Sequence, residues 1–398
     1  MSWFTDEEWA ETEKEIPQPA DGLVQKYLQG REGLVAQEAS QRSDHAFRQS
    51  LSPIARRACA IVDRIRADEM ARVWTPQLEE AIATREAGNV TVHPGMMFGL
   101  AKDAMETTEL WRVVRRMPKG ALLHAHNDAM VDFGFLIGVV LDTPGMHVAC
   151  RDSHLATDDA RRERVPAPRV GFDVVGQKDK GPPLKTLFPI LAWFRKLCAD
   201  EGVTIPLFLH AGETLGDGTE TDGNLFDAVL LGARRVGHAF SLYKHPLLVE
   251  LVKDRRILVE SCPISNEVLR LCSSVTAHPL PALLARGVPC ALSNDDPGML
   301  GHDTAGATHD FWSALQGWDN LGLAGLGSLA ENSVRWAAFE DENDAAWVQG
   351  VKEASLGSGV KAQRLKEWAV AWEEFCLWVV TEYGDRYPDE EEMVDAAG

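Results

Sequence analysis

The sequence predicts an α/β protein built on a TIM-like (β/α)8 barrel, preceded by a helical N-terminal extension. From Met117 onward, short apolar runs alternate with helical stretches, an order typical of parallel α/β proteins. From Gly176 onward, the ends of successive runs lie 24 to 34 residues apart, which matches the roughly 30 residues of one strand and helix in such a barrel. A doubly wound sheet would give a similar period. The barrel is favoured because the runs end in reactive polar side chains, where barrel enzymes place their catalytic groups.

The expected elements follow from the apolar pattern. Short apolar runs predict strands, and apolar residues recurring every three or four positions predict helices. Strands are expected at Gly120–His124, Val170–Gly176, Ile205–His210, Arg235–His238, Ile257–Cys262 and Val288–Asn294. Helices are expected at Leu184–Ala199, Leu225–Ala233, Pro246–Val252, Glu267–Cys272, Leu280–Ala285 and Asp310–Gln316.

The chain divides into two predicted parts. Residues 1–110 form a helical extension, in which Arg42–Ala71 and the stretch that starts at Leu100 and runs to Arg116 carry apolar residues at helical spacing. This part contains no cluster of catalytic side chains, so its expected role is packing or oligomerisation. Residues 111–398 form the barrel and its C-terminal helices, with a closing helix over Leu365–Tyr383.

Charge and cysteine content limit the partners and the location that can be expected. The 398 residues include 60 acidic and 40 basic side chains, a formal net charge of −20. Such a surface repels nucleic-acid polymers and anionic membranes, and a small neutral or cationic substrate suits it better. The seven cysteines form no CxxC pair, which favours a reducing compartment. With no signal-peptide pattern and no run of ~20 apolar residues, a cytoplasmic location is expected.

Two histidines in His124-Ala125-His126 are the first candidate metal ligands. Side chains two positions apart at a strand end point to the same face, so both imidazoles can reach one ion. Asp128 lies two residues further on and shares that face. Taken alone, the pair is explained equally well by two polar residues at the mouth of a strand.

Two further strand ends carry candidate groups for proton transfer. His210-Ala211-Gly212-Glu213 places a carboxyl group in the turn after a histidine, where it can donate a proton beside a metal. Gly237-His238 ends the following run. A solvated loop glutamate and a structural histidine are the alternative interpretations of these two positions.

The last expected strand is followed by the pair Asp295-Asp296. Adjacent carboxylates after a buried strand are costly unless a cation or hydrogen bonds stabilise them, although Asp-Asp-Pro also forms ordinary turns. Three histidines and one aspartate at strand ends form a suitable ligand set for one catalytic Zn²⁺, with a position left for water. Together, the four motifs predict a zinc-dependent hydrolase, that is, a metallo-hydrolase barrel.

Six motifs resemble those of the adenosine deaminase family, in the same order. The first motif and the long N-terminal extension most resemble the adenosine deaminase-related growth factor subfamily within the metal-dependent amidohydrolase superfamily. The resemblance covers about residues 100 to 380, discontinuously. The motifs are MPKGALLHAH (117–126), GFDVVG (171–176), HAGET (210–214), RVGHAF (235–240), ESCPISN (260–266) and SNDDP (293–297).

The resemblance implies zinc-dependent deamination of adenosine or 2′-deoxyadenosine to inosine or 2′-deoxyinosine, with release of ammonia. It also implies a homodimer through the N-terminal helices. Glu213 would protonate the purine ring, and His238 would orient and help deprotonate the water that attacks C6. The zinc ligands would be His124, His126, His210 and Asp295, of which Asp295 would also act in catalysis. The substrate contacts would be Asp296 and the Gly176 N–H to the purine and Asp128 to the ribose 5′-hydroxyl.

The barrel is expected to be incomplete. In the family, Gly176 belongs to the fourth strand, three periods after His126, which requires about 90 residues at roughly 30 per period. This chain has 50 residues between those positions, and much of residues 151–169 is polar and charged. One or two βα units are therefore expected to be missing between residues 126 and 170.

Two alternatives to adenosine deamination remain open from the sequence. A related amidohydrolase could act on another aminopurine, although the negative charge disfavours a nucleotide substrate. The shortened barrel favours the second alternative, a catalytically impaired nucleoside-binding or growth-factor-like protein. The intact set of catalytic groups argues against it.

Overall fold

A parallel four-stranded sheet forms the centre of the structure. The computed structural model describes residues 5–86, 98–126, 129, 171–176, 180–302, 305–339 and 342–388. Each strand pairs in parallel with the next one along the chain, so a crossover separates every pair, which confirms the parallel α/β prediction. In sheet order, the strands are β1 (Phe208–Ala211), β2 (Arg235–His238), β3 (Leu258–Ser261) and β4 (Cys290–Leu292).

Two isolated bridges extend this sheet at its edges. Phe172 pairs in parallel with Leu207 just before β1, and Ala125 pairs in parallel with Asp295 just after β4. The segment that ends at Ala125 comes earliest of these in the chain, yet it lies beside the last strand, as closure of a barrel requires. One or two βα units are expected to be missing between residues 126 and 170. This segment lies outside the described residues, Ala129 excepted.

Neither of the first two expected strands forms a regular strand in the part of the chain that the structure describes. The run Gly120–His124 forms no regular strand, and its contact with the sheet is the bridge at Ala125. The reason is that its backbone bonds elsewhere, because the Ala121 N–H donates to Ser333 Oγ at 2.8 Å. Of Val170–Gly176, the described part contributes only the bridge at Phe172.

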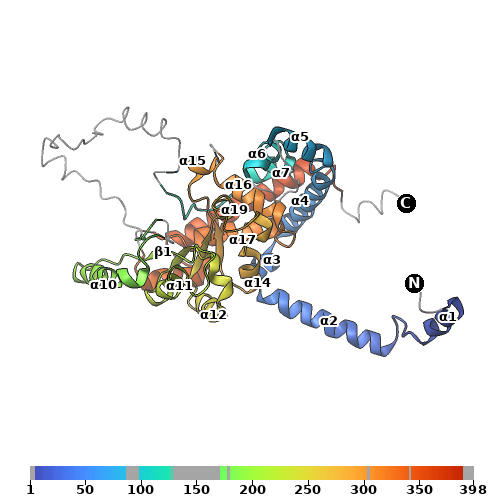
Figure 1. Cartoon of the computed structure of the whole chain (residues 1–398), viewed down its shortest axis with the longest axis horizontal. Helices are drawn as coiled ribbons and strands as arrows, with labels where there is room; N and C mark the ends of the chain where they lie inside the picture. Colours follow the sequence, from blue (N-terminus) through green and yellow to red (C-terminus); the bar gives the residue numbers. More distant parts are fainter. Residues whose placement is uncertain are drawn as a thin grey trace.

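Helices connect the strands along the chain and follow the last of them (Figure 1). Their order matches the predicted alternation, and α14 has the predicted bounds. Before β4 they are α10 (Leu184–Asp200), α11 (Glu220–Leu230), η2 (Phe240–Lys244), α12 (Pro246–Asp254), α13 (Pro263–Val268), η3 (Val275–Ala277) and α14 (Leu280–Ala285). After β4 they are α15 (Pro297–Leu300), α16 (Ala307–Gly317), α17 (Gly322–Arg335), α18 (Asp344–Glu353), η4 (Ala354–Leu356) and α19 (Val360–Tyr383).

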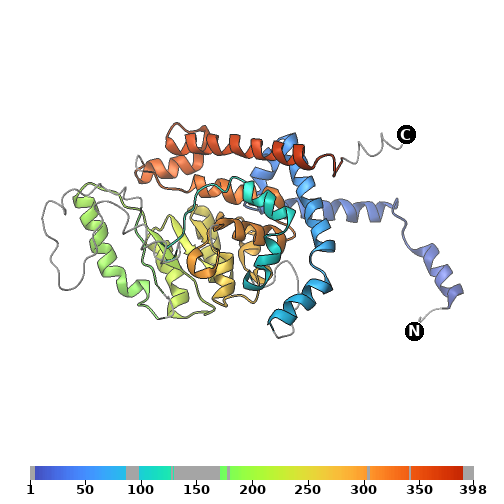
Figure 2. The ribbon, with the colours of Figure 1, turned by 90° about the horizontal axis from the view of Figure 1, so that it is seen from above.

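The N-terminal part is helical. Its α4 packs against α19 and α17, and α7 packs against α16, whereas α1 and α2 project away from the rest of the chain (Figures 1 and 2). No side chain of α2 is buried. Among the described helices, none has the length and apolar character needed to cross a membrane. The elements are α1 (Asp6–Glu15), α2 (Gly22–Gln41), α3 (His45–Ser50), α4 (Pro53–Arg72), α5 (Pro76–Glu86), α6 (Phe98–Met105) and α7 (Glu109–Arg116).

The single helix expected over Arg42–Ala71 is two helices, α3 and α4. The chain is extended at Ser52, whose hydroxyl accepts a hydrogen bond from the Ala55 N–H at 3.0 Å. Pro53 then occupies the first helical position, where its missing N–H costs nothing. This combination of N-cap and proline starts a new helix and outweighs the continuous apolar pattern.

Two other expected helices have different bounds in the structure, because a capping residue or a proline sets where each helix begins. The stretch from Leu100 to Arg116 is divided into α6 and α7 at Thr108, whose Oγ1 accepts from the Trp111 N–H at 3.0 Å. The helix expected at Glu267–Cys272 instead runs from Pro263 to Val268, because Pro263 favours the first helical position.

We expect Thr108→Ala to lower the free energy of unfolding by about 2 kcal/mol. The substitution removes the N-cap of α7, and it also leaves the indole N–H of Trp312, which donates to Thr108 Oγ1 at 3.1 Å, buried without an acceptor. Urea unfolding monitored by circular dichroism measures the change. Thr108→Ser keeps the hydroxyl and is expected to stay close to the wild-type midpoint, so equal midpoints for both variants would contradict the assignment.

Candidate metal centre and active site

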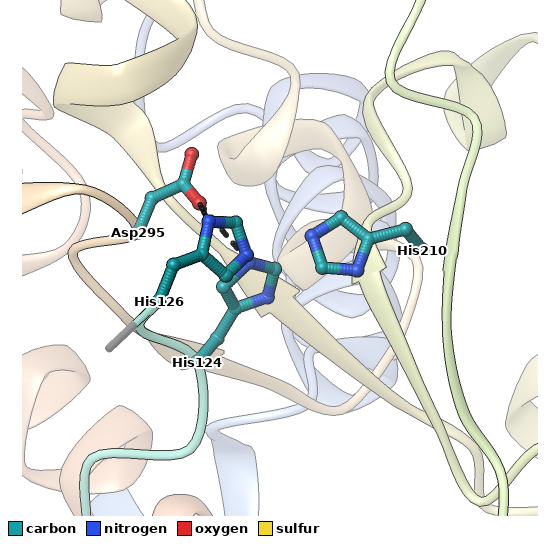
Figure 3. A group of neighbouring side chains, drawn as sticks. All are labelled: His124, His126, His210 and Asp295. Atoms are coloured by element: carbon teal, nitrogen blue, oxygen red, sulfur yellow. Dashed lines mark hydrogen bonds and ion pairs between the residues drawn. The ribbon is translucent and has the colours of Figure 1, made fainter. Parts of the chain in front are cut away.

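The strand ends bring four candidate ligands to one place. His210 lies in β1, Asp295 follows β4, and His124 and His126 flank the bridge at Ala125. Their candidate ligand atoms all lie within 4.8 Å of one another, and Figure 3 shows His124 and His126 on one segment, with Asp295 and His210 each on another. The parallel bridge between the first segment and the last strand explains this arrangement. We call these four residues the ligand cluster.

Asp295 connects the members of the ligand cluster. Its Oδ1 lies 3.2 Å from Nε2 of His124 and 3.4 Å from Nδ1 of His126, and its Oδ2 accepts from the Ser265 hydroxyl at 2.6 Å. Burial raises the pKa of Asp295, but hydrogen bonds from His124 and Ser265 and the charge of His124 outweigh burial and lower it well below its usual range. Asp295 is therefore a carboxylate, as a metal ligand must be.

The polar atoms of the ligand cluster fit a bound metal ion. Nε2 of His126 is buried and has no hydrogen-bond partner among the described residues, whereas Nδ1 of the same ring lies 2.8 Å from Asp296 Oδ1. An unsatisfied buried nitrogen costs about 1–3 kcal/mol, and coordination to a metal would remove that cost. Three imidazoles and one carboxylate are also a donor set typical of catalytic Zn²⁺.

Two carboxylates orient the ligand histidines from behind. Glu260 in β3 lies 3.0 Å from Nδ1 of His124, and Asp173 bonds Nδ1 of His210. These contacts occupy Nδ1 of each ring and leave Nε2 to face a metal. Neither residue was predicted. The sequence could have indicated Glu260, because a charged side chain inside the buried strand Leu258–Ser261 requires a partner.

Glu260 itself belongs to a buried ion pair. The guanidinium of Arg235 in β2 donates to Glu260 Oε1 and also to the Trp336 carbonyl, the latter at 3.2 Å. Burial raises the pKa of Glu260, but Arg235 and His124 outweigh it and lower the pKa. Glu260 therefore stays charged and can accept the Nδ1 hydrogen of His124.

We expect Glu260→Gln to weaken zinc binding by about 10-fold to 100-fold. The amide removes the charge that supports His124 as a ligand, while the side chain keeps its shape. Titration of the metal-free protein with zinc against a competing fluorescent chelator measures the affinity. The exposed Glu250 of α12 provides a matched control, since Glu250→Gln lies outside the site. Equal affinity for wild type and Glu260→Gln would rule out this supporting role.

Glu213 and His238 lie beside the ligand cluster. Gly212, with a φ of +72°, turns the chain after β1, and a Cβ at this position would lie 2.8 Å from the Leu225 side chain. Glu213 Oε1 is 3.5 Å from Nδ1 of His238, whose Nε2 is 3.8 Å from Asp295 Oδ2. Burial and the charge of the neighbouring histidines lower the pKa of His238 well below its usual range.

The backbone around the ligand cluster is strained and tightly packed. His238 and Asp295 have φ values of 61° and 59°, a left-handed conformation that costs about 1–3 kcal/mol for residues other than glycine and is concentrated at functional sites. Gly237 lies under two ligand rings, and a Cβ there would be 2.9 Å from His124 Cε1 and 3.3 Å from His210 Cγ. The absence of a side chain in the middle of β2 thus allows the two imidazoles to approach each other.

A cavity of about 480 Å³ adjoins the ligand cluster. This volume is in the range of small-molecule sites, roughly 300–1,000 Å³. Every predicted site residue that the structure describes lies in this cavity or in the ligand cluster, whereas Asp128 is outside the described residues. The lining residues are His126, Val175, Gly176, His210, Glu213, His238, Leu269, Leu271, Asp295 and Asp296.

The arrangement is that of a metal-dependent hydrolase barrel, with imidazole and carboxylate ligands at the ends of parallel strands and a cavity above them. A sequence profile described as adenosine deaminase matches residues 120–354, more than half of the chain. The chain therefore belongs to the adenosine deaminase family.

Curated relatives support this placement. Adenosine deaminase 2-A of Danio rerio is 39% identical over 187 residues, 46% of this chain and 35% of the relative. Adenosine deaminase 2 of Homo sapiens is 38% identical over 180 residues, 45% of this chain and 34% of the relative. An adenosine deaminase of Lutzomyia longipalpis is 36% identical over 221 residues, 54% and 37% of the two chains. The matched region spans about a third of the length of these relatives, and the adenosine deaminase 2 matches agree with the growth-factor-subfamily resemblance.

Solved structures also align with the chain. An adenine deaminase from Arthrobacter aurescens aligns with a TM-score of 0.41 and 18% identity, covering 75% of this chain and 96% of that one. An amidohydrolase from Burkhoderia ambifaria with bound Zn aligns with a TM-score of 0.38 and 19% identity, covering 54% of each chain.

Proposed function

We propose that this protein catalyses the zinc-dependent hydrolytic deamination of adenosine and 2′-deoxyadenosine to inosine and 2′-deoxyinosine, with release of ammonia. The observation that supports the proposal most directly is the position of Glu213 and His238 in the same cavity as His126, His210 and Asp295. A metal site, a proton donor and a group that can orient water are thus adjacent, as hydrolytic deamination requires.

The metal would be held by the ligand cluster. Its three imidazoles and one carboxylate suit Zn²⁺, and the cation would supply Lewis acidity that lowers the pKa of a coordinated water to about 7. Glu260 and Asp173 would keep the rings of His124 and His210 in the orientation that binding needs.

The cavity residues would divide the remaining work. The Glu213 carboxyl group would donate a proton to the purine nitrogen next to C6 as the oxygen of water bonds to C6, and the electron pair of the C=N bond would move to that nitrogen. One proton of the water would pass to the amino group and the other would return to Glu213. The bond between C6 and the amino nitrogen would then break, and ammonia would leave. Asp296 and the Gly176 N–H would hold the purine, with Leu269 and Leu271 forming an apolar wall of the cavity.

The charge of the protein supports a neutral substrate. A net charge of −20 and the Asp296 carboxylate, which lines the cavity beside the ligand cluster, disfavour a phosphorylated substrate. A nucleoside-binding protein without turnover is the second candidate. The observation that favours it is the short spacing of 50 residues between His126 and Gly176.

The test is adenosine consumption by the purified, zinc-loaded protein, followed by the absorbance change on conversion to inosine. Chelation is expected to abolish turnover, and added zinc is expected to restore it. A panel of adenosine, 2′-deoxyadenosine, adenine and adenosine monophosphate tests the substrate class. A folded, zinc-loaded protein that binds nucleoside without turnover would contradict the proposal and support the second candidate.

A further inference from the structure

Asn266 and His278 form a buried chain of hydrogen bonds that ends at His238, outside the ligand cluster. We call this chain of hydrogen bonds the relay. Asn266 lies in α13 and is fully buried, and His278, just after η3, is 6% exposed. Neither side chain lines the cavity or belongs to the ligand cluster. Three hydrogen bonds connect the backbone at Leu280, through these two side chains, to the ring of His238.

The backbone N–H of Leu280 fixes which group donates and which accepts in each of these hydrogen bonds. The Leu280 N–H donates to Nδ1 of His278 at 3.1 Å. A backbone N–H can only donate, so Nδ1 must be an acceptor and the ring must be neutral, with its hydrogen on Nε2. Nε2 of His278 lies 3.0 Å from Oδ1 of Asn266 and therefore donates to it.

The orientation of the Asn266 amide determines which ring nitrogen of His238 accepts a hydrogen bond. Because its carbonyl oxygen accepts from His278, its amide group faces Nδ1 of His238, with Nδ2 at 3.2 Å. The opposite orientation of the amide would place two donors against each other at His278. An amide NH₂ only donates, so Nδ1 of His238 must accept, and the ring hydrogen must be on Nε2.

One competing group also approaches this nitrogen. Glu213 Oε1 lies 3.5 Å from Nδ1 of His238, and a carboxylate there would favour a hydrogen on Nδ1. The amide of Asn266 is closer, at 3.2 Å. The protonated form of Glu213, which the proposed function requires, has a donor of its own and does not oppose the relay.

Packing keeps the relay in place. The ring of His278 contacts Phe240 edge-on at a centroid distance of 5.4 Å and an interplanar angle of 89°. Burial lowers the pKa of His278 to about 3, so the ring stays neutral near neutral pH. The backbone N–H of Asn266 is also fixed, because it donates to the Cys262 carbonyl at 3.0 Å.

We propose that Asn266 and His278 are positioning residues that hold His238 in the tautomer with hydrogen on Nε2. His238 then presents an N–H donor, not a lone pair, toward Asp295 and the reacting water. Its contribution to the reaction is therefore orientation of the water. The proposal rests on the proposed function for its catalytic consequence, but the tautomer itself is a property of the folded chain.

The tautomer is measured directly by long-range ¹H–¹⁵N correlation spectra of the metal-free protein labelled with ¹⁵N in its histidine rings. The His238 signals are identified by their loss in His238→Gln. We expect Nδ1 of His238 to show the shift of an unprotonated nitrogen and Nε2 that of a protonated one. A hydrogen on Nδ1 in the wild-type protein would overturn the proposal.

The isosteric variant Asn266→Asp tests the relay itself. It replaces the donor with an acceptor, so we expect the hydrogen of His238 to move to Nδ1. The control is Asn224→Asp, another buried amide, whose Oδ1 accepts from the Leu184 N–H in a different part of the barrel. An unchanged tautomer in Asn266→Asp would overturn the proposal. If that variant does not fold, His278→Leu provides the same comparison, because it removes the donor to Asn266.

Kinetics give a second readout. His278→Leu is expected to lower kcat for adenosine about 10-fold with KM unchanged, and His278→Gln, which retains an N–H donor, is expected to recover most of the loss. Equal kcat values for the two variants would contradict a role through the relay. If the tautomer is as expected but no variant, nor the wild type, deaminates adenosine, the proposed function fails and the relay stands.

Discussion

Glu213→Gln is expected to lower kcat for adenosine by about 10²-fold to 10⁴-fold, the range that a positioned general acid contributes. The amide has the shape of the carboxyl group but no acidic proton for the purine ring. Zinc content is expected to stay at the wild-type level, because Glu213 is not a member of the ligand cluster. Stopped assays at saturating adenosine, together with metal analysis of the same samples, measure both quantities.

The control for this substitution is Glu201→Gln, an exposed glutamate at the C-terminal end of α10. It is expected to behave as the wild type. Full activity of Glu213→Gln would remove Glu213 from the reaction, whereas a parallel loss of zinc would show that its effect is structural.

His126→Ala is the second substitution with a large expected effect. We expect zinc affinity to fall by at least about 10²-fold, since one of four ligands carries roughly a quarter of the 10–16 kcal/mol with which proteins hold structural zinc. Turnover is expected to disappear at zinc concentrations that saturate the wild type. His126 suits this test because it is less deeply buried than His124, so its loss leaves a smaller cavity.

Competition with a chelator measures the affinity of His126→Ala, and circular dichroism checks that the variant folds. His45→Ala, in α3, is the matched control because its imidazole lies outside the ligand cluster. An unchanged zinc stoichiometry and affinity in His126→Ala would mean that the metal, if bound, lies elsewhere.

The sequence predicted the reactive ends of the strands because those signals are local. A histidine or aspartate that follows a short apolar run is visible in a single segment, and His210, His238 and Asp295 all lie where this pattern places them. The helix at Leu280–Ala285 was equally local, since its apolar residues and its proline lie within one turn of each other. Its bounds agree with the prediction.

The supporting residues could not be predicted in the same way, because their roles depend on neighbours in other strands. Glu260 matters through Arg235 on β2 and through a histidine 136 residues earlier in the chain. Asn266 matters through a ring on β2 and through His278. None of these pairs shares a segment, so apolar periodicity carries no information about them.

Helix breaks were missed for a different reason. The apolar pattern continues through Ser52 and Thr108, but each side chain caps the helix that follows. The preference for a cap is a short-range effect of about 1 kcal/mol and is not visible in the hydrophobic pattern. The expected cytoplasmic location, the homodimer through the N-terminal helices and the division of domains at residue 110 stay predictions.

The bridge between Ala125 and Asp295 has a consequence for the order in which the protein is made. His124 and Asp295 are 171 residues apart in the chain, so a ribosome that has released the first histidines must add the whole sheet before their aspartate emerges. At about 5–20 residues per second, that interval lasts on the order of ten seconds or more. Of the ligand cluster, zinc that arrives in this interval would meet only the histidines, and the complete ligand set would exist only after β4 has formed and Asp295 pairs with Ala125.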